Sequence, residues 1–115
     1  MDRKSAQQTQ LTAELVLRAY AAGIFPMAEN RDDPTVFWVD PRVRGVLPLE
    51  TFHIPRKLRK IVRRGDFEVQ CDSAFADVID RCAQTTAERH ETWINKEIRG
   101  AYIDLHDRGF AHSVE

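Results

Sequence analysis

The stretch Pro55-Arg56-Lys57-Leu58-Arg59-Lys60-Ile61-Val62-Arg63-Arg64 holds six basic side chains and no acidic one. The rest of the 115-residue chain therefore carries 11 of the 17 Lys and Arg residues and all 18 Asp and Glu residues. The overall net charge of -1 conceals this separation of charge along the chain. A concentrated basic segment of this kind points to an anionic partner.

The same stretch predicts a short helix. Leu58, Ile61 and Val62 stand at i, i+3 and i+4, which places apolar side chains on one side of the helix and most of the charges on the other. Pro55 suits the first helical position, and Gly65 suits the residue just past the end. Two interpretations are open: a solvated helix whose charge is offset by acids elsewhere, or a surface that binds nucleic-acid phosphates without reading the sequence.

Toward the N-terminus, the pattern predicts a small α/β unit over residues 11–49. Residues 1–10 are polar and are expected to be disordered. Residues 12–22 have helical spacing between a capping threonine and a glycine. The β-branched and aromatic run 35–39 predicts a strand, and residues 46–49 predict a second short extended piece, held to a sheet edge by its proline.

Toward the C-terminus, residues 66–71 alternate polar and apolar side chains, which predicts a half-buried strand. Asp72 or Ser73 is expected to cap the helix that follows, whose apolar residues recur at helical spacing over 75–83. The whole chain is therefore expected to fold as an α+β protein.

The last helix is expected to begin at an Asn95 cap and to stop at Gly109. Residues 110–115 then have the composition of a strand, with no further element after them to pair with it. Because complete proteins usually cover such an edge, we expect a truncated protein.

Both cysteines, Cys71 and Cys82, fall at apolar positions of their elements and are expected to be small core residues. They lack zinc-site spacing, and the four histidines are scattered, so no metal site is predicted. Apolar runs are too short for a membrane-spanning helix or a signal peptide, which makes the cytoplasm the expected compartment.

Eight short strings along the chain occur in the order and spacing of one known family, the leucyl/phenylalanyl-tRNA–protein transferases, which this sequence resembles from about Leu11 to Glu115. Met27 stands where many relatives have tryptophan. The strings are Ala19 to Pro26, Phe37 to Arg42, His53 to Arg56, Phe67 to Val69, Ala74-Phe75, Thr92 to Ile94, Ala101-Tyr102 with Leu105-His106, and Ala111 to Glu115.

The resemblance implies a cytoplasmic bacterial enzyme that takes leucine or phenylalanine, and less often methionine, from aminoacyl-tRNA. It attaches the amino acid to the N-terminal Arg or Lys of a protein, which marks that protein for degradation through the N-end rule pathway. No metal or organic cofactor is implied. The implied fold is a small N-terminal α/β domain, here 11–49, followed by an acetyltransferase-like (GNAT-like) domain that begins, incomplete, in residues 50–115.

The resemblance also implies which residues contact tRNA. Trp93 would stack on the terminal adenosine, and Trp38 and Met27 would lie near the 3′ end and the aminoacyl group. The family's basic cluster, thought to hold the acceptor stem by its phosphates, corresponds here to Arg56, Arg59, Lys60, Arg63 and Arg64.

No catalytic residue is assigned. The resemblance implies that the carboxylate and amide groups proposed for the chemistry, and most of the pocket for the Leu or Phe side chain, follow the histidine-serine-x-glutamate string on which this chain ends. Neither His112 nor Glu115 is promoted to that role. Two alternatives to the enzyme stay open: a noncatalytic tRNA- or RNA-binding module, and a nonfunctional fragment.

Overall fold

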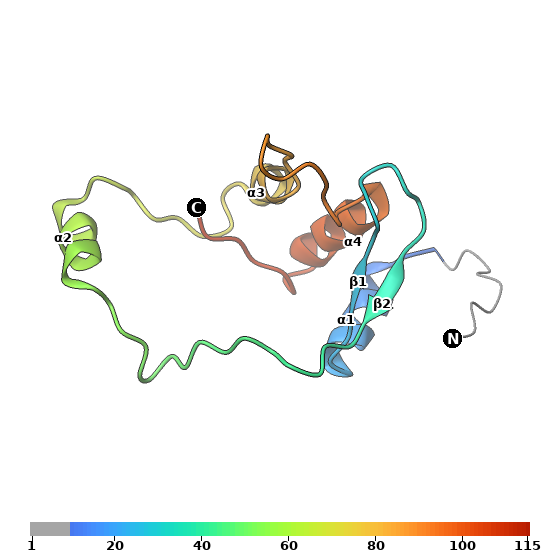
Figure 1. Ribbon diagram of the computed structural model, residues 1–115, viewed down its shortest axis with the longest axis horizontal. Helices are drawn as coiled ribbons and strands as arrows, with labels where there is room; N and C mark the ends of the chain where they lie inside the picture. Colours follow the sequence, from blue (N-terminus) through green and yellow to red (C-terminus); the bar gives the residue numbers. More distant parts are fainter. Residues whose placement is uncertain (1–9) are drawn as a thin grey trace.

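The computed structural model describes residues 10–115, which form a mixed α+β structure with four helices and one two-stranded sheet (Figure 1). The disorder expected of residues 1–10 lies outside the described residues, apart from Gln10. In chain order the elements are α1 (Ala13–Ala21), β1 (Phe25–Met27), β2 (Phe37–Val39), α2 (Arg56–Arg64), α3 (Phe75–Cys82) and α4 (Lys96–Asp107).

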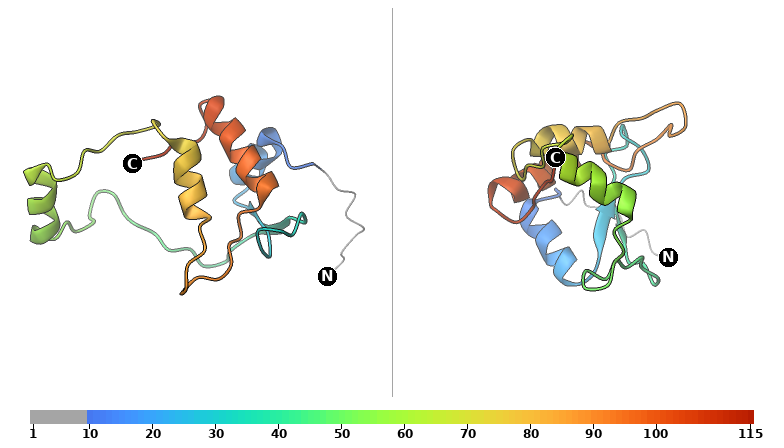
Figure 2. Two further views of the ribbon diagram at one scale, coloured as in Figure 1. Left: turned by 90° about the horizontal axis from the view of Figure 1, so that it is seen from above. Right: turned by 90° about the vertical axis from the view of Figure 1, so that its left-hand side faces the viewer.

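The main body is built around α4, which packs against α1 on one side and α3 on the other (Figure 2). Val16 of α1 is fully buried against Ala101 and Leu105 of α4. Ile98 of α4, also fully buried, belongs to a second cluster with Ala28, Ala83 and Ile94 that holds α3 and the hairpin loop. The core therefore joins α1, the first described helix, to α4, the last one.

Three of the predicted helix ends are confirmed, whereas Pro55, expected at the first helical position, is the N-cap residue just before α2. The backbone N–H of Leu15 donates to the Thr12 hydroxyl at 3.1 Å, and that of Ile98 donates to the Asn95 side-chain oxygen at 2.9 Å. Gly65 ends α2 with φ 72°, a left-handed conformation that costs glycine little. Each of these caps involves residues close together in the sequence, so the sequence alone was sufficient to predict it.

The hairpin of β1 and β2 is antiparallel and pairs Phe25 with Val39 and Met27 with Phe37. Only residues 37–39 of the strand predicted over 35–39 are in the ladder. The connecting loop is fixed to α4 because the buried Asn95 side chain also donates to the Asp33 carbonyl at 2.9 Å. One buried amide thus caps a helix and positions a loop at the same time.

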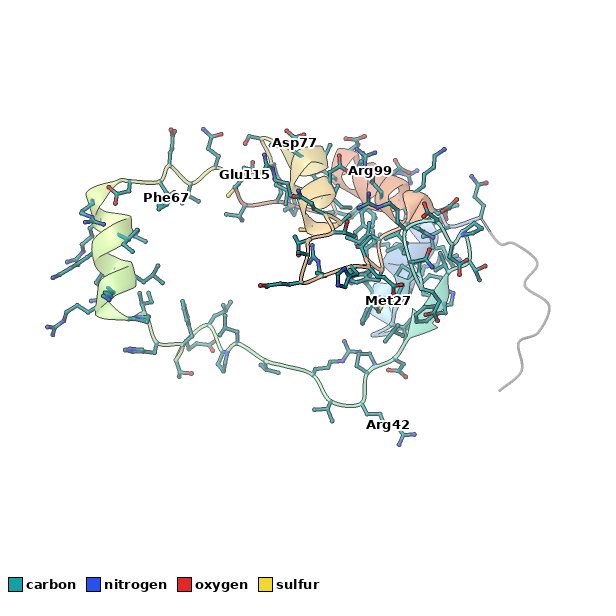
Figure 3. All side chains as sticks on the ribbon, turned by 45° about the horizontal axis from the view of Figure 1, so that its top comes forward. Met27, Arg42, Phe67, Asp77, Arg99 and Glu115 are labelled. Atoms are coloured by element: carbon teal, nitrogen blue, oxygen red, sulfur yellow. The ribbon has the colours of Figure 1, made fainter. Side chains whose placement is uncertain are left out.

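Helix α2 stands apart from the main body at the end of two long connections (Figure 1). The predicted helix is confirmed, but none of its residues is buried, and Val62 is 65% exposed. The expectation of an extended strand piece at residues 46–49 was wrong, because those residues are exposed and pair with nothing in the described chain. Figure 3 shows Arg42 and Phe67 on the two connections, away from the packed helices.

The strand predicted over residues 66–71 is also wrong for most of its length. Phe67 is 76% exposed, and only Cys71 is paired, in a single bridge to Val114. The backbone groups of Gln70 and Glu115 exchange two hydrogen bonds of 2.7 and 2.9 Å beside that bridge. The last residues are therefore paired after all, by the segment before α3.

Both cysteines are exposed, so their expected place in the core was wrong. Cys71 lies in the bridge segment, and Cys82 lies in the last turn of α3. Helical spacing put Cys82 on the apolar side of α3 correctly, since it lines a cavity there, but that side is only partly covered. No helix within residues 10–115 has both the length and the apolar character needed to cross a membrane.

Neither Asp72 nor Ser73 caps α3 with its side chain, contrary to the expectation. Instead the Glu115 carboxylate accepts from the backbone N–H groups of Ser73 (2.6 Å) and Ala74 (3.2 Å), and also from the Ser73 hydroxyl. These hydrogen bonds hold the pKa of Glu115 below its usual value. A residue more than forty positions away thus accepts hydrogen bonds from backbone N–H groups at the start of this helix.

We expect Glu115→Gln to weaken α3, because glutamine keeps an acceptor oxygen but loses the negative charge at the helix start. The folded pKa of Glu115 is lowered, so its contribution is present above the unfolded pKa of about 4.3 and is lost as the pH falls through the folded value. Thermal unfolding from pH 7 to pH 2 should show the variant less stable at neutral pH and equal in acid. Glu88→Gln, in an exposed loop, is the matched control; an equal effect of both changes would contradict the cap.

Candidate functional site

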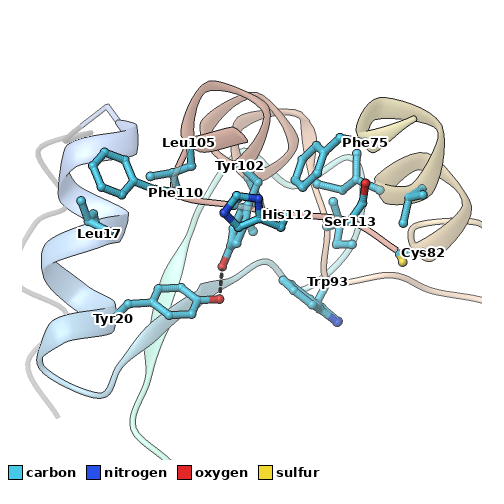
Figure 4. Close-up of a pocket in the computed structure, with 15 residues that line it drawn as sticks. Leu17, Tyr20, Phe75, Cys82, Trp93, Tyr102, Leu105, Phe110, His112 and Ser113 are labelled. Carbon is cyan, nitrogen blue, oxygen red and sulfur yellow. Dashed lines mark hydrogen bonds between the residues drawn. The ribbon is translucent and has the colours of Figure 1, made fainter. Parts of the chain in front are cut away.

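An apolar cavity of about 460 Å³ lies between α1, α3, α4 and the segment that follows α4 (Figure 4). Its walls are formed mostly by aliphatic and aromatic side chains from all three helices. The residues that the argument uses are Leu17, Tyr20, Phe75, Trp93, Tyr102 and His112. A cavity of this size with few polar groups can enclose a medium-sized apolar side chain.

Trp93 lies at this cavity with its side chain only partly covered, at 39% exposure. Its neighbours Thr92 and Ile94 are buried, and its carbonyl accepts a 2.9 Å hydrogen bond from the Ala28 N–H. The backbone is therefore fixed on both sides while the indole remains accessible. An aromatic plane held in this way can stack a flat ligand group.

Two tyrosine hydroxyls meet at the same cavity. Tyr20 of α1 and Tyr102 of α4 lie 2.7 Å apart, oxygen to oxygen, and their rings meet edge to face with centroids 6.2 Å apart. Burial, assisted by the hydrogen bond with Tyr20, raises the pKa of Tyr102 well above its usual value. The Tyr102 hydroxyl therefore keeps its proton throughout the neutral range.

His112 also lines the cavity, and Asp72 orients its ring. His112 Nδ1 lies 2.8 Å from one Asp72 carboxylate oxygen, while the Ser113 N–H donates to the other at 2.9 Å. The hydrogen bond with His112 is the main reason that the pKa of Asp72 is lowered. Asp72 also has a left-handed backbone, at φ 59°, which aspartate tolerates better than most residues.

Met27 and Trp38, two of the predicted ligand-binding residues, lie on the hairpin beside this cavity and do not line it. Trp38 pairs with Pro26 across the hairpin, and the residue after Met27 is Ala28, whose N–H bonds to Trp93. The backbone segments of Met27, Trp38 and Trp93 are thus neighbours. The structure brings together the elements that carry these three side chains.

The five predicted phosphate-binding side chains all lie on α2 and are all exposed, namely Arg56, Arg59, Lys60, Arg63 and Arg64. Arg64 is the only one of these five side chains that forms an ion pair within residues 10–115; its partner is Asp66, at 3.0 Å. A hollow lined by residues 51–54, Arg56 and Arg59 lies at the start of the helix. The structure does not bring α2 against the cavity, from which the two connections separate it (Figure 1).

Comparison with known families decides the assignment. The family model for leucyl/phenylalanyl-tRNA protein transferase matches residues 46–115, and the model for the N-terminal domain of the same family matches residues 9–42. The chain belongs to this family. The resemblance seen in the eight short strings is thereby confirmed.

Two relatives in this transferase family illustrate the degree of similarity. The leucyl/phenylalanyl-tRNA–protein transferase of Nitrobacter winogradskyi is 55% identical over 115 residues, which cover all of this chain and 51% of the relative. The transferase of Paramagnetospirillum magneticum is 51% identical over 105 residues, covering 91% of this chain and 50% of the relative. The chain spans about half the length of the curated relatives it matches.

Sequence reasoning about this transferase-family chain singled out Trp93 but missed the tyrosine pair and the oriented histidine. Tyr20 lies on α1 and Tyr102 on α4, and their hydroxyls meet across 82 residues of sequence. No signal within one helix could have shown that contact. Among residues 10–115 no group of three or more potential metal ligands is found.

Proposed function

We propose that this chain provides the tRNA-binding part of an aminoacyltransferase. The enzyme would move leucine or phenylalanine, and less readily methionine, from aminoacyl-tRNA to the N-terminal Arg or Lys of a protein. That protein would be marked for degradation through the N-end rule pathway in the cytoplasm. The observation that carries the proposal is the apolar cavity with the accessible Trp93 beside it, in a chain that belongs to the transferase family.

The cavity suits the aminoacyl end of the substrate. An aminoacyl ester is already activated, so the protein must mainly bind and orient it. Apolar walls from α1, α3 and α4 would supply part of the site for the Leu or Phe side chain, and Trp93 would stack on the terminal adenosine. Met27 and Trp38 would flank the 3′ end from the neighbouring hairpin. We assign binding, and no step of the chemistry, to these residues.

The exposed cations of α2 would hold the acceptor stem by its phosphates. Their side chains extend from a helix that is free of the core, and four of the five are without an ion pair in the described residues. Phosphate contacts of this kind give affinity without sequence preference and depend strongly on salt. An α2 at the end of two connections can reach a part of the tRNA distant from the aminoacyl cavity.

We also propose that the chain contains a small N-terminal α/β domain, residues 11–49, and the first part of an acetyltransferase-like domain, residues 50–115. The change from one family match to the next at residues 42–46 supports this division. The cavity would then lie between the two domains, since α1 supplies one wall and α3 and α4 the others. Ligand sites are common at such boundaries.

Two experiments test the proposal. One is the transfer reaction itself, and the other compares the affinity of the chain for two tRNA ligands. Tritium-labelled leucine should move from leucyl-tRNA to an N-terminal Arg peptide in an enzyme of full family length, and Trp93→Ala should reduce that transfer. In this chain, a stable amide mimic of leucyl-tRNA should bind about 10 to 100 times more tightly than uncharged tRNA, because the cavity buries the leucine side chain.

The second candidate, an RNA-binding module with no aminoacyl recognition, makes the opposite prediction. Its affinity would be equal for the charged mimic and the uncharged tRNA. That result, together with an unaltered transfer rate in the Trp93→Ala enzyme, would refute the proposed use of the cavity. Phe67→Ala, an exposed aromatic residue that does not line the cavity, is the matched control for loss of an aromatic ring.

A further inference from the structure

The cavity has one polar feature that the apolar walls do not explain, the Tyr20–Tyr102 hydroxyl pair. Tyr20 is 52% exposed, whereas Tyr102 is partly buried. Their oxygens meet at 2.7 Å between α1 and α4 (Figure 4). The chain contains no other tyrosine. Both tyrosines of the protein are therefore used at one place, where α1 meets α4 at the proposed ligand cavity.

A count of donors and acceptors shows which hydrogen bonds this pair of hydroxyls can form with a ligand. Each phenol has one O–H donor, and one of the two protons is used within the pair. Tyr102 is the more buried of the two, and its hydroxyl has no other hydrogen-bond partner within the described residues, so we assign it as the donor and Tyr20 as the acceptor. Tyr20 then keeps its own O–H free. A hydroxyl that already accepts a hydrogen bond is also a better donor, because the two bonds polarise one another.

We propose that the Tyr20 hydroxyl, positioned by Tyr102, donates a hydrogen bond to the carbonyl oxygen of the bound aminoacyl group. The pair would thus distinguish a ligand that has a carbonyl from one of equal shape that lacks it. A single donor in an apolar wall is suited to a neutral acceptor such as an ester carbonyl. This inference rests on the proposed function, since it assumes that the aminoacyl end of tRNA enters the cavity.

The apolar surroundings strengthen the inference. Leu17 and Phe110, with other apolar side chains, line the same cavity, so a ligand oxygen there would find few other protein donors to replace the missing one. The edge-to-face packing of the two rings fixes their relative position without either hydroxyl. Removing a hydroxyl by a Tyr→Phe change should therefore leave the ring contact in place and alter hydrogen bonding alone.

The test compares two RNA hairpins that end in adenosine and carry leucine through different stable linkages. In one the linkage is an amide, which keeps the carbonyl oxygen, and in the other an ether, in which CH₂ replaces the carbonyl. We expect the unaltered chain to bind the amide a few-fold to about tenfold more tightly than the ether. Tyr20→Phe should abolish that preference, and Tyr102→Phe should reduce it. The double variant should lose no more than Tyr20→Phe, because the two hydroxyls act as one unit.

The outcomes separate this inference from the proposed function. If both hairpins bind and Trp93→Ala weakens them, but Tyr20→Phe leaves the amide preference intact, the pair is only a clamp between α1 and α4 and the inference is overturned. If Trp93→Ala changes the affinity of neither hairpin, the proposed function itself has failed. Thermal unfolding of each Tyr→Phe variant checks that a changed preference does not reflect loss of the fold.

Discussion

A variant in which all five predicted phosphate contacts of α2 are glutamine is expected to bind tRNA weakly and with little dependence on salt. Each phosphate contact contributes about 0.9 to the slope of log affinity against log salt on a duplex, so the slope should become shallower by about 4 to 5. At physiological salt the affinity should fall by roughly two orders of magnitude or more. Filter binding at several salt concentrations measures both quantities. The changes are Arg56→Gln, Arg59→Gln, Lys60→Gln, Arg63→Gln and Arg64→Gln.

A charge-matched control shows whether the position of these cations matters. Arg63→Gln with Arg64→Gln removes two positive charges from α2, and Arg42→Gln with Arg81→Gln removes two exposed ones elsewhere. The first pair should lower the salt slope by nearly 2, reduced slightly because Asp66 already neutralises part of Arg64. An equal decrease in both double variants would mean that net charge alone attracts the RNA, and α2 would then be merely a solvated helix.

The Ile98→Ala variant should be the most destabilised single variant of the core. Ile98 is fully buried in the cluster that holds α3, α4 and the hairpin loop together. Removing its side chain from such a site costs about 2–5 kcal/mol of unfolding free energy. Five of the nine buried hydrophobic residues within 10–115 are alanine, so few other large apolar side chains remain to stabilise the core when that of Ile98 is removed. A loss of this size can unfold a domain of marginal stability.

Circular dichroism during thermal unfolding measures this effect, with Val62→Ala as its control. Val62 is a β-branched residue on exposed α2, and its truncation should change the unfolding free energy by less than about 0.5 kcal/mol. The described structure would be wrong about the core if the two variants unfolded at the same temperature. Loss of hydrogen-exchange protection throughout α4 in Ile98→Ala would show that the cluster unfolds as one unit.

The sequence predicted those features whose causes lie within a few residues. Thr12 and Asn95 bond to backbone groups three positions ahead, and Gly65 provides its own left-handed backbone, so local patterns were sufficient. The four helices and the α+β class followed from these caps and from the spacing of apolar residues. Trp93 could be named because it stands in Thr92 to Ile94, one of the eight strings in which the family resemblance is seen.

The failures have a common physical cause, which is that burial and pairing depend on distant partners. Alternation predicted a half-buried strand at residues 66–71, but Phe67 is 76% exposed and only Gln70 and Cys71 pair with residues near Glu115. The cap of α3 comes from Glu115, and the Tyr20–Tyr102 contact joins two helices far apart in sequence. Periodicity shows which side of an element is apolar; it does not show what, if anything, covers that side.

The packing of α1 on α4 also constrains how the chain acquires its structure. Tyr20 and Tyr102 are 82 residues apart, and everything between them forms a loop that must close before Val16 can be buried. Closing a long loop costs entropy before any contact repays it, so folding is expected to be slow compared with helix formation. During synthesis, α1 would leave the ribosome well before α4 exists. Its apolar side would remain unburied until α4 had been synthesised and could pack against it.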